Sequence, residues 1–185
     1  LAGVSVWIER GSTAILGASG AGKTSLLNLL VQFEEPGSGL LSRDVPEGAM
    51  PVYWAPQGGG LWPHLTAEEH LLAVSASDET ERAREMLGRF DLGECADQRP
   101  GELSMGERGR LGLARALAAD PAVLVLDEPL AHVDRARHGR FWGVVREHVR
   151  RTGCSLVFAT HSPELVLSEA DRVICLREGR LVYDG

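Results

Sequence analysis

The stretch Gly17-Ala18-Ser19-Gly20-Ala21-Gly22-Lys23-Thr24 decides the fold of this chain. It fits the pattern G-x-x-x-x-G-K-[ST] at every fixed position. The apolar run 13–16 precedes it, and good helix formers follow from residue 23 to about residue 33. The pattern therefore stands between a strand and a helix, as a loop that binds phosphate requires. The alternative is a Gly-rich turn before a helix, with a buried lysine of no consequence.

Each residue type in this loop suits the binding of phosphate. Glycines allow backbone N–H groups to wrap the β- and γ-phosphate oxygens, and the N-terminus of the next helix adds a favourable dipole. Lys23 would place its ammonium between those phosphates, and Thr24 would bind Mg²⁺.

Two adjacent carboxylates, Asp127 and Glu128, follow the continuous apolar run 123–126. Such a run is typical of a strand buried on both faces of a parallel sheet, and ligands of open α/β sheets bind at the carboxyl ends of strands. In phosphate-loop enzymes a carboxylate at this place binds Mg²⁺, and a neighbouring group orients the attacking water. We expect Asp127 to serve the metal and Glu128 to act as general base. The alternative is an acidic N-cap on the following turn.

The composition limits the class of protein. A length of 185 residues suits one domain with room for a sub-lobe. The net charge of −7 argues against a protein that mainly neutralises nucleic-acid phosphates, so we expect no nucleic-acid partner. Three cysteines without C-x-x-C spacing favour a reduced cytosolic compartment. No signal peptide or membrane span is visible, so a membrane role would come through a partner.

The order of expected elements indicates an α/β sheet with an inserted helical lobe. Alternating Val4, Val6 and Ile8 predict a strand that turns into a second strand at 13–16, giving an N-terminal antiparallel β portion. Capping patterns at Thr66, Asp78 and Ser104 begin helices, and a further helix starts at Ser162-Pro163. Other strands are expected at 52–55, 123–126, 156–160, 172–177 and 180–183, and a long helix at about 134–151. The helices at 66–119 would form the lobe within a single domain spanning 1–185.

Four further motifs stand in the order found in the nucleotide-binding domains of ATP-binding cassette (ABC) proteins. Gln57 matches the Q-loop glutamine of that family, and Leu103-Ser104-Met105-Gly106-Glu107 matches its signature LSGGQ at three of five places. Asp134 matches the D-loop aspartate, and His161, after a predicted strand, matches the switch histidine. With the phosphate loop and the two carboxylates, nearly the whole chain resembles the ABC family.

The resemblance implies a fold and a function. The expected fold class is α/β, a P-loop NTPase core of the ABC ATPase type with an inserted small helical lobe. The expected function is an ATP-binding and ATP-hydrolysing subunit that powers an ABC membrane transporter. Two such subunits, identical or different, would sandwich two MgATP, and transmembrane permease subunits would hold them at the inner face of the cell membrane. The segments 61–66 and 127–131 look more like those of importers than those of exporters.

The resemblance also implies a role for each site residue. Glu128 is the expected general base, His161 a hydrogen-bond donor to the γ-phosphate, and Gln57 a sensor of metal and water. The expected metal ligands are Thr24, Gln57 and Asp127. The residues expected to bind ATP are Gly17, Ala18, Ser19, Gly20, Ala21, Gly22, Lys23, Thr24, Ser104, Gly106 and Asp134.

Simpler structural interpretations stand beside some of these roles. A capping box with Glu107 alone would explain Ser104, and a histidine such as His161 taken by itself is more often structural. Trp62 and Leu65 lie in the region that contacts a membrane partner in the family, and they can equally pack the helical lobe.

The chain departs from the family pattern at its signature. Met105 replaces the first glycine and Glu107 the usual glutamine, which puts a bulky side chain and an added carboxylate beside the expected γ-phosphate. The aromatic residue that stacks on adenine in the family would lie upstream of Leu1, and the segment 42–50 and the helical lobe are shorter than usual. We therefore expect good recognition of the phosphates and weak recognition of the base.

Three other functions compete with a transporter ATPase. A soluble ABC-type machine acting on DNA, ribosomes or iron–sulfur assembly is one, although no coiled-coil insertion or basic tail supports the DNA or ribosome versions. A kinase or GTPase would leave the signature, Asp134 and His161 unexplained. A catalytically weak nucleotide-binding module stays open because the signature is altered.

Overall fold

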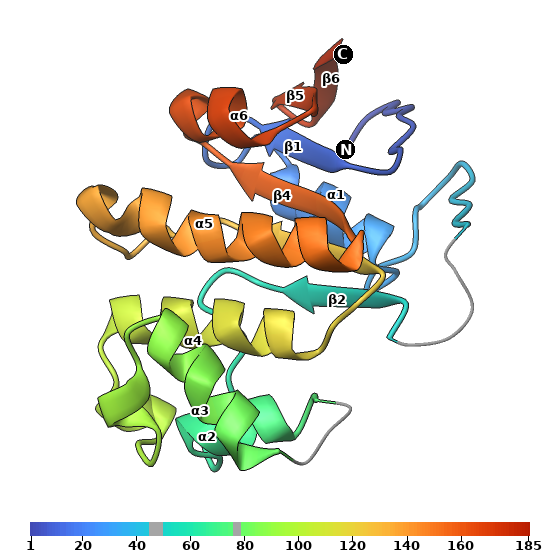
Figure 1. The fold of residues 1–185 in the computed structure, drawn as a ribbon. Coiled ribbons are helices and arrows are strands. Elements are labelled where there is room, and N and C mark those ends of the chain that lie inside the picture. Colours follow the sequence, from blue (N-terminus) through green and yellow to red (C-terminus); the bar gives the residue numbers. More distant parts are fainter. Residues whose placement is uncertain (45–49, 76–78) are drawn as a thin grey trace. The chain divides into compact units, whose positions relative to one another are not determined.

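The computed structural model describes residues 1–44, 50–75 and 79–185. In chain order these residues form β1 (Ser12–Leu16), α1 (Lys23–Leu30), β2 (Val52–Ala55), α2 (Ala67–Leu72), α3 (Thr80–Arg89), α4 (Met105–Ala118), β3 (Val123–Asp127), α5 (Arg135–Thr152), β4 (Ser155–Thr160), α6 (Pro163–Glu169), β5 (Arg172–Arg177) and β6 (Arg180–Asp184) (Figure 1). Two short 3-10 turns, Gly93–Cys95 and Pro100–Glu102, precede α4. Across the described ranges, no helix has the length and apolar character needed to cross a membrane.

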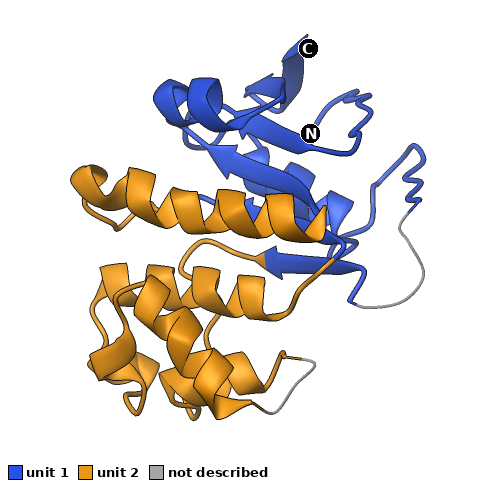
Figure 2. Ribbon diagram, viewed as in Figure 1, with its two compact units in different colours: residues 1–54, 122–128, 154–185 blue, residues 55–121, 129–153 orange. Residues whose placement is uncertain are grey.

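The chain divides into two compact units (Figure 2). Unit 1 consists of Leu1–Trp54, Ala122–Glu128 and Cys154–Gly185, and unit 2 of Ala55–Pro121 and Pro129–Gly153. The predicted helical lobe at 66–119 falls within unit 2, together with α5. That residues 1–185 act as a single domain stays a prediction.

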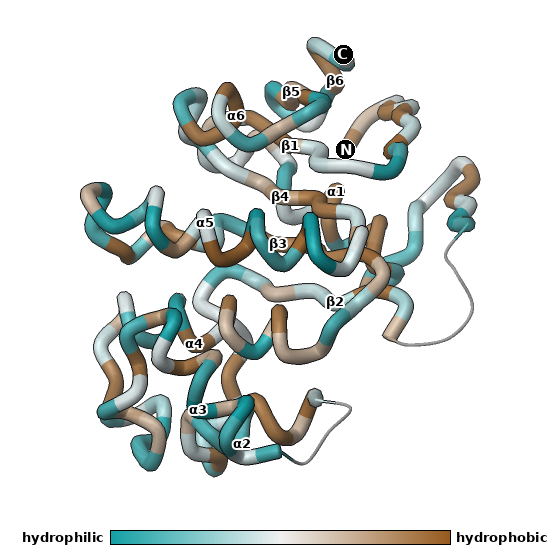
Figure 3. Tube along the Cα trace, viewed as in Figure 1, coloured by the Kyte–Doolittle hydropathy of each residue, from teal (hydrophilic) through white to brown (hydrophobic). Residues whose placement is uncertain are grey.

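Unit 1 is built, in the described part of the chain, on a six-stranded sheet with the order β2-β3-β4-β1-β5-β6. β1 pairs in parallel with β4 and β5, and β3 pairs in parallel with β4. α1 packs against β3 and β4, and α6 packs against β1 and β4. Strands covered in this way need apolar side chains, and β4 is largely hydrophobic along its length (Figure 3). The predicted α/β core is therefore confirmed.

The expected N-terminal antiparallel β portion is wrong. Residues 1–11 contain no strand, and β1 has parallel neighbours on both sides. The alternation at Val4, Val6 and Ile8 is real, because these side chains are half-buried and pack against the core of the sheet while their neighbours are exposed. An alternation of apolar residues indicates which side chains face the core. It does not show that the backbone forms hydrogen bonds with a neighbouring strand. The antiparallel pair is instead β5 with β6, at the other end of the chain.

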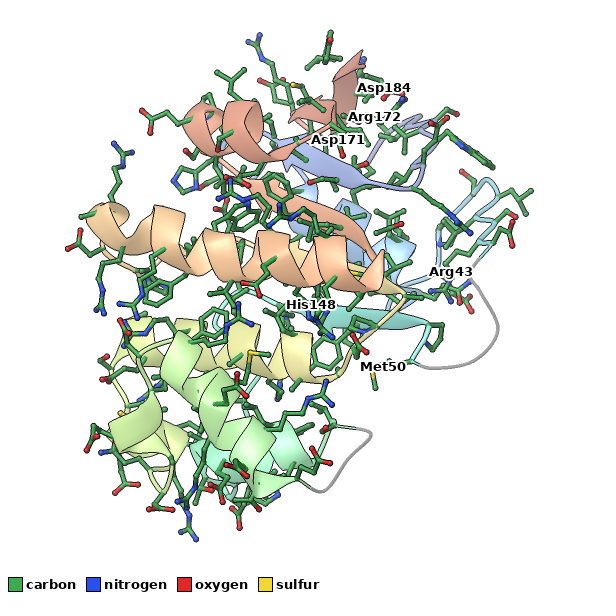
Figure 4. All side chains as sticks on the ribbon, viewed as in Figure 1. Arg43, Met50, His148, Asp171, Arg172 and Asp184 are labelled. Carbon is green, nitrogen blue, oxygen red and sulfur yellow. The ribbon has the colours of Figure 1, made fainter. Side chains whose placement is uncertain are left out.

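Side-chain contacts hold the last hairpin against the sheet (Figure 4). Arg172 of β5 forms an ion pair with Asp184 of β6. The neighbouring Asp171 accepts a hydrogen bond of 2.9 Å from the backbone N–H of Ser12, at the start of β1.

Unit 2 is helical, with α4 in contact with α2, α3 and α5. α5 alternates between hydrophilic and hydrophobic stretches (Figure 3), and its buried Phe141 stacks on the buried Phe90 at 5.8 Å between ring centroids. The capping boxes predicted at Thr66 and Ser104 are confirmed. The cap predicted at Asp78 lies outside the described residues.

Candidate active site

The phosphate loop connects β1 to α1. Gly20 and Gly22 have φ angles of 78° and 101°, in the left-handed region that favours glycine. A Cβ atom on Gly17 would lie 2.7 Å from the carbonyl oxygen of Leu176, so no side chain fits there. The first turn of α1 carries no acidic residue, and its N–H groups are therefore open to an anion.

Lys23 is buried in this loop, with 7% of its surface exposed. Its Nζ atom donates to the carbonyl oxygens of Gly17 at 2.8 Å and Ala18 at 3.3 Å, and lies 3.3 Å from Oε1 of Glu128. Because an ammonium group has three protons, these contacts engage all of its donors. A phosphate bound to Lys23 must therefore replace one of them.

Thr24 and Asp127 lie together at the end of β3. The Thr24 hydroxyl donates a hydrogen bond of 2.7 Å to Oδ2 of Asp127. Burial raises the pKa of Asp127 above its usual range, and the charge of Glu128 adds to this, whereas the Thr24 hydrogen bond and Lys23 oppose it. The pair offers Mg²⁺ one hydroxyl and one carboxylate oxygen. Since Mg²⁺ takes hard oxygen ligands and is usually held by one or two carboxylates with phosphates and water, these residues fit it.

No group of three or more His, Cys, Asp or Glu side chains placed to hold a metal occurs in residues 1–44, 50–75 and 79–185. A metal at Thr24 and Asp127 would accordingly need ligands from a bound phosphate and from water.

Glu128 has an unusual backbone conformation. Its φ angle is 47°, a left-handed value that side chains rarely adopt, and its N–H donates to the carbonyl oxygen of Ala159 at 3.0 Å. Its Oε2 atom lies 3.0 Å from Nδ1 of His161. An ionised carboxylate can only accept, so Nδ1 of His161 donates this bond. Both carboxylate oxygens of Glu128 are thus engaged, one by Lys23 and the other by His161.

The sheet explains why these residues meet. β3, β4 and β1 are parallel neighbours, so their carboxyl ends lie at one edge of the sheet. The residues that follow them along the chain are brought together there, as the sequence predicted. They are Lys23 and Thr24 after β1, Asp127 and Glu128 at the end of β3, and His161 after β4.

Ala18, Ser19 and Ala21 belong to unit 1 with the rest of the phosphate loop, whereas Gln57, Ser104, Gly106 and Asp134 belong to unit 2. Gln57 is exposed and directly follows β2 and Pro56. Asp134 is the N-cap of α5 and accepts a hydrogen bond of 3.2 Å from the N–H of Ala136. A Cβ atom on Gly106 would lie 2.9 Å from the carbonyl oxygen of His132, so glycine is needed where α4 approaches this residue.

The signature serine is engaged within its own helix. Ser104 Oγ lies 2.6 Å from Oε2 of Glu107, to which the hydroxyl donates, and it accepts the Glu107 N–H at 3.3 Å. These hydrogen bonds with Ser104 hold the pKa of Glu107 below its usual range, so the carboxylate stays charged. Met105, the other departure, is 60% exposed. The capping interpretation of Ser104 therefore describes its contacts fully.

Sequence reasoning missed two buried residues beside the loop that follows Gln57. Arg115 donates to the carbonyl oxygens of Gly59 and Gly60, and His70 accepts from the N–H of Trp62. Gly112, a glycine inside α4, is a signal that could have led to this contact, because such a glycine often marks a close approach of another backbone. No pattern in the sequence points to His70.

The chain is similar in sequence to curated proteins named as transport or import ATP-binding proteins. The putrescine transport ATP-binding protein PotG of Escherichia coli (strain K12) is 35% identical over 195 residues, which cover 98% of this chain and 52% of PotG. The Fe(3+) ions import ATP-binding protein FbpC of Pseudomonas fluorescens (strain Pf0-1) is 34% identical over 187 residues, covering 94% of this chain and 53% of FbpC. The chain spans about half the length of these curated relatives.

A solved structure shows the same fold, and a family model matches the sequence. The dimeric post-hydrolysis state of the ATP-binding cassette MJ0796, bound to ADP and Pi, has a TM-score of 0.83 at 24% identity over 97% of this chain and 87% of that one, a likeness of fold. Residues 1–131 match the family model described as ABC transporter. The chain therefore belongs to the ABC transporter family.

Proposed function

We propose that this chain binds and hydrolyses ATP and powers an ABC importer. The observation that carries the proposal is the cluster of Lys23, Thr24, Asp127, Glu128 and His161 at one edge of the unit 1 sheet. Relatives named as import ATP-binding proteins support the transport direction. Substrate and direction belong to the whole transporter, of which this chain spans one part.

In this proposal the loop glycines and Lys23 bind the β- and γ-phosphates, and Thr24 and Asp127 hold Mg²⁺. Bound Mg²⁺ neutralises charge on the phosphates. Since all three donors of Lys23 are engaged, the γ-phosphate takes Lys23 away from Glu128. This frees Oε1 of Glu128 to accept a proton from the attacking water.

His161 remains on Oε2 of Glu128 and fixes the carboxylate in place. Because its Nδ1 donates to Glu128, its Nε2 donates to the γ-phosphate only when the ring carries both protons. The predicted role of His161 therefore requires the imidazolium form.

Residues of unit 2 have further roles in the proposed function. Gln57 senses metal and water, and Ser104, Gly106 and Asp134 face the ATP held by a second ABC ATPase subunit, identical or different. Transmembrane permease subunits bind this pair at the inner face of the membrane. The acidic net charge of −7 supports a function without nucleic acid.

The experiment that tests the proposal compares two variants. Lys23→Ala should lose MgATP binding, because the variant lacks the ammonium group that this proposal places on the β- and γ-phosphates. Glu128→Gln should keep binding and lose turnover by about 10²-fold or more, the contribution of a positioned base. Binding is measured by calorimetry and turnover by phosphate release. Retained affinity in Lys23→Ala, or retained turnover in Glu128→Gln, would contradict the assignment.

One observation favours a second candidate, a catalytically weak nucleotide-binding module. The hydroxyl of Ser104 donates its hydrogen bond to Glu107, so it has no proton left for an anion, and the charged carboxylate of Glu107 repels one. Under this candidate Glu107→Gln raises the rate of MgATP hydrolysis. The matched control is Glu102→Gln, which alters a carboxylate that accepts from the N–H of Arg99 in the same manner. Equal rates in wild type and Glu107→Gln would remove the candidate.

A further inference from the structure

The loop after Gln57 needs an external support. Gly58, Gly59 and Gly60 have φ angles of 82°, 82° and 56°, so three successive residues adopt the left-handed region. Glycine makes this path accessible, and it also leaves the free chain with many alternatives. The position of the loop must therefore be fixed by its neighbours.

On one side, the loop lies against α4. A Cβ atom on Gly112 would lie 2.7 Å from the Cα atom of Gly59, so the two backbones touch. Arg115, which is 3% exposed, donates to the carbonyl oxygens of Gly59 at 2.6 Å and Gly60 at 3.1 Å. Its guanidinium also lies 4.5 Å from the centre of the Trp62 ring. The carbonyl oxygens of Gly59 and Gly60 lie outside any strand or helix, and the charged guanidinium of Arg115 supplies their hydrogen-bond donors.

On the other side, His70 of α2 holds the end of the loop. The backbone N–H of Trp62 donates to Nε2 of His70 at 2.9 Å, and Nδ1 lies 2.6 Å from the carbonyl oxygen of Thr66. Since Nε2 accepts, Nδ1 must carry the proton and donate to Thr66. The His70 and Trp62 rings stack at 5.5 Å and 21°. These contacts require the neutral Nδ1–H form of a fully buried imidazole.

We propose that His70 and Arg115 are positioning residues that fix residues 58–62 to α2 and α4, so that the loop which begins at Gln57 moves together with the helix capped by Ser104. Only the expected effect of these contacts on ATP hydrolysis rests on the proposed function of Gln57 and Ser104. The contacts themselves belong entirely to unit 2.

Protonation of His70 would break its contact with the loop, because both ring nitrogens would then donate and the N–H of Trp62 would lose its acceptor. Burial lowers the pKa of His70, and the neighbouring Arg115 and His64 lower it further, while the hydrogen bond to Thr66 and the carboxylate of Glu69 oppose this. The neutral form is thus maintained at neutral pH.

Two variants of His70 separate its hydrogen bonds from its bulk. His70→Leu fills the same site without an acceptor, and His70→Gln supplies an amide oxygen that accepts but does not titrate. His148→Gln is the control, because His148 is also buried in unit 2 and lies against Asp120 and Arg151 instead of the loop. Hydrogen exchange of the Trp62 amide is followed by NMR in the whole chain.

At pH 7.5, His70→Leu should speed the exchange of this amide about 5-fold, the effect of losing one ordinary hydrogen bond, while His70→Gln and His148→Gln leave it near the wild-type rate. On acidification, the amide of the wild type should become unprotected with the same midpoint as protonation of the His70 ring, and that of His70→Gln should not. Unchanged exchange in His70→Leu, or protonation of His70 with the amide still protected, would overturn the proposal.

The catalytic consequence is tested separately with Arg115→Lys, which keeps the charge and loses the two-carbonyl fork. We expect kcat for MgATP to fall about 10-fold with KM unchanged, because the phosphate loop is intact and only the position of Gln57 is disturbed. An unchanged kcat in Arg115→Lys would overturn the catalytic part. Absence of hydrolysis in the wild type would instead contradict the proposed function and leave the exchange result standing.

Discussion

Lys23 shows at the scale of one residue how strongly the loop selects its side chain. Of 19 Lys and Arg residues, it is the single lysine of the chain. An ammonium is a compact point charge with three donors, whereas a guanidinium is a wide planar fork. Lys23 contacts the carbonyl oxygens of Gly17 and Ala18 within a loop that leaves it 7% exposed, and a fork does not fit such a space. Everywhere else the chain uses arginine for its positive charges.

We therefore expect Lys23→Arg to lower the affinity for MgATP at least about 10-fold although the charge is kept. The measurement is calorimetric titration, with Arg180→Lys on the exposed edge of β6 as the matched control. Wild-type affinity in Lys23→Arg would mean that charge alone, without shape, determines binding.

Helices and strands were largely predictable from local pattern. The caps at Thr66, Ser104 and Ser162 are fixed by side chains that satisfy the first N–H groups of their own helices, and such contacts are encoded within four residues. The strand expected at Val4, Val6 and Ile8 failed because a ladder needs a partner strand, which no local pattern specifies. Gly112 signals that a backbone approaches α4 closely, but it does not identify Gly59 as the partner, since the two residues are far apart in the chain.

This contact gives a prediction for the stability of α4. Gly112→Ala should lower the free energy of unfolding by about 1–3 kcal/mol, because the new methyl group would overlap the backbone of Gly59. Gly109→Ala is the matched control in the same helix, where a Cβ atom meets nothing within 4 Å, and it should raise stability by about 0.5–1 kcal/mol. Urea unfolding of both variants checks this. Equal stabilities of the two would contradict the close approach.

At the scale of the whole molecule, the sequence predicted which residues gather in unit 1 but not how they contact each other. Motifs at the ends of parallel strands must meet: Lys23 contacts Glu128, and Thr24 contacts Asp127. The ion pair of Lys23 with Glu128 and the buried tautomer of His70 depend on packing around each group. Such features carry no signature in the chain.

Buried histidines should make the stability of the molecule depend on pH. Burial lowers the pKa of both His70 and His148. Below a pH of about 6.5, these two histidines bind protons in the unfolded chain but stay neutral in the folded chain. Their stabilising contribution is thus complete above this pH and is lost as the pH falls toward the folded pKa values.

We expect the free energy of unfolding to decrease between pH 7.5 and pH 5.5, and to decrease less when both residues are replaced by glutamine. Urea unfolding at the two pH values provides the measurement. The same decrease in wild type and double variant would assign the pH dependence to other groups.

In the proposed function, this chain acts as an ABC ATPase that closes on a second subunit around ATP. Light scattering of Glu128→Gln, with and without MgATP, tests it most directly, because this variant binds nucleotide without consuming it. We expect a monomer that becomes a dimer when MgATP is added and returns to a monomer with ADP. A chain that stays monomeric at saturating MgATP would contradict it.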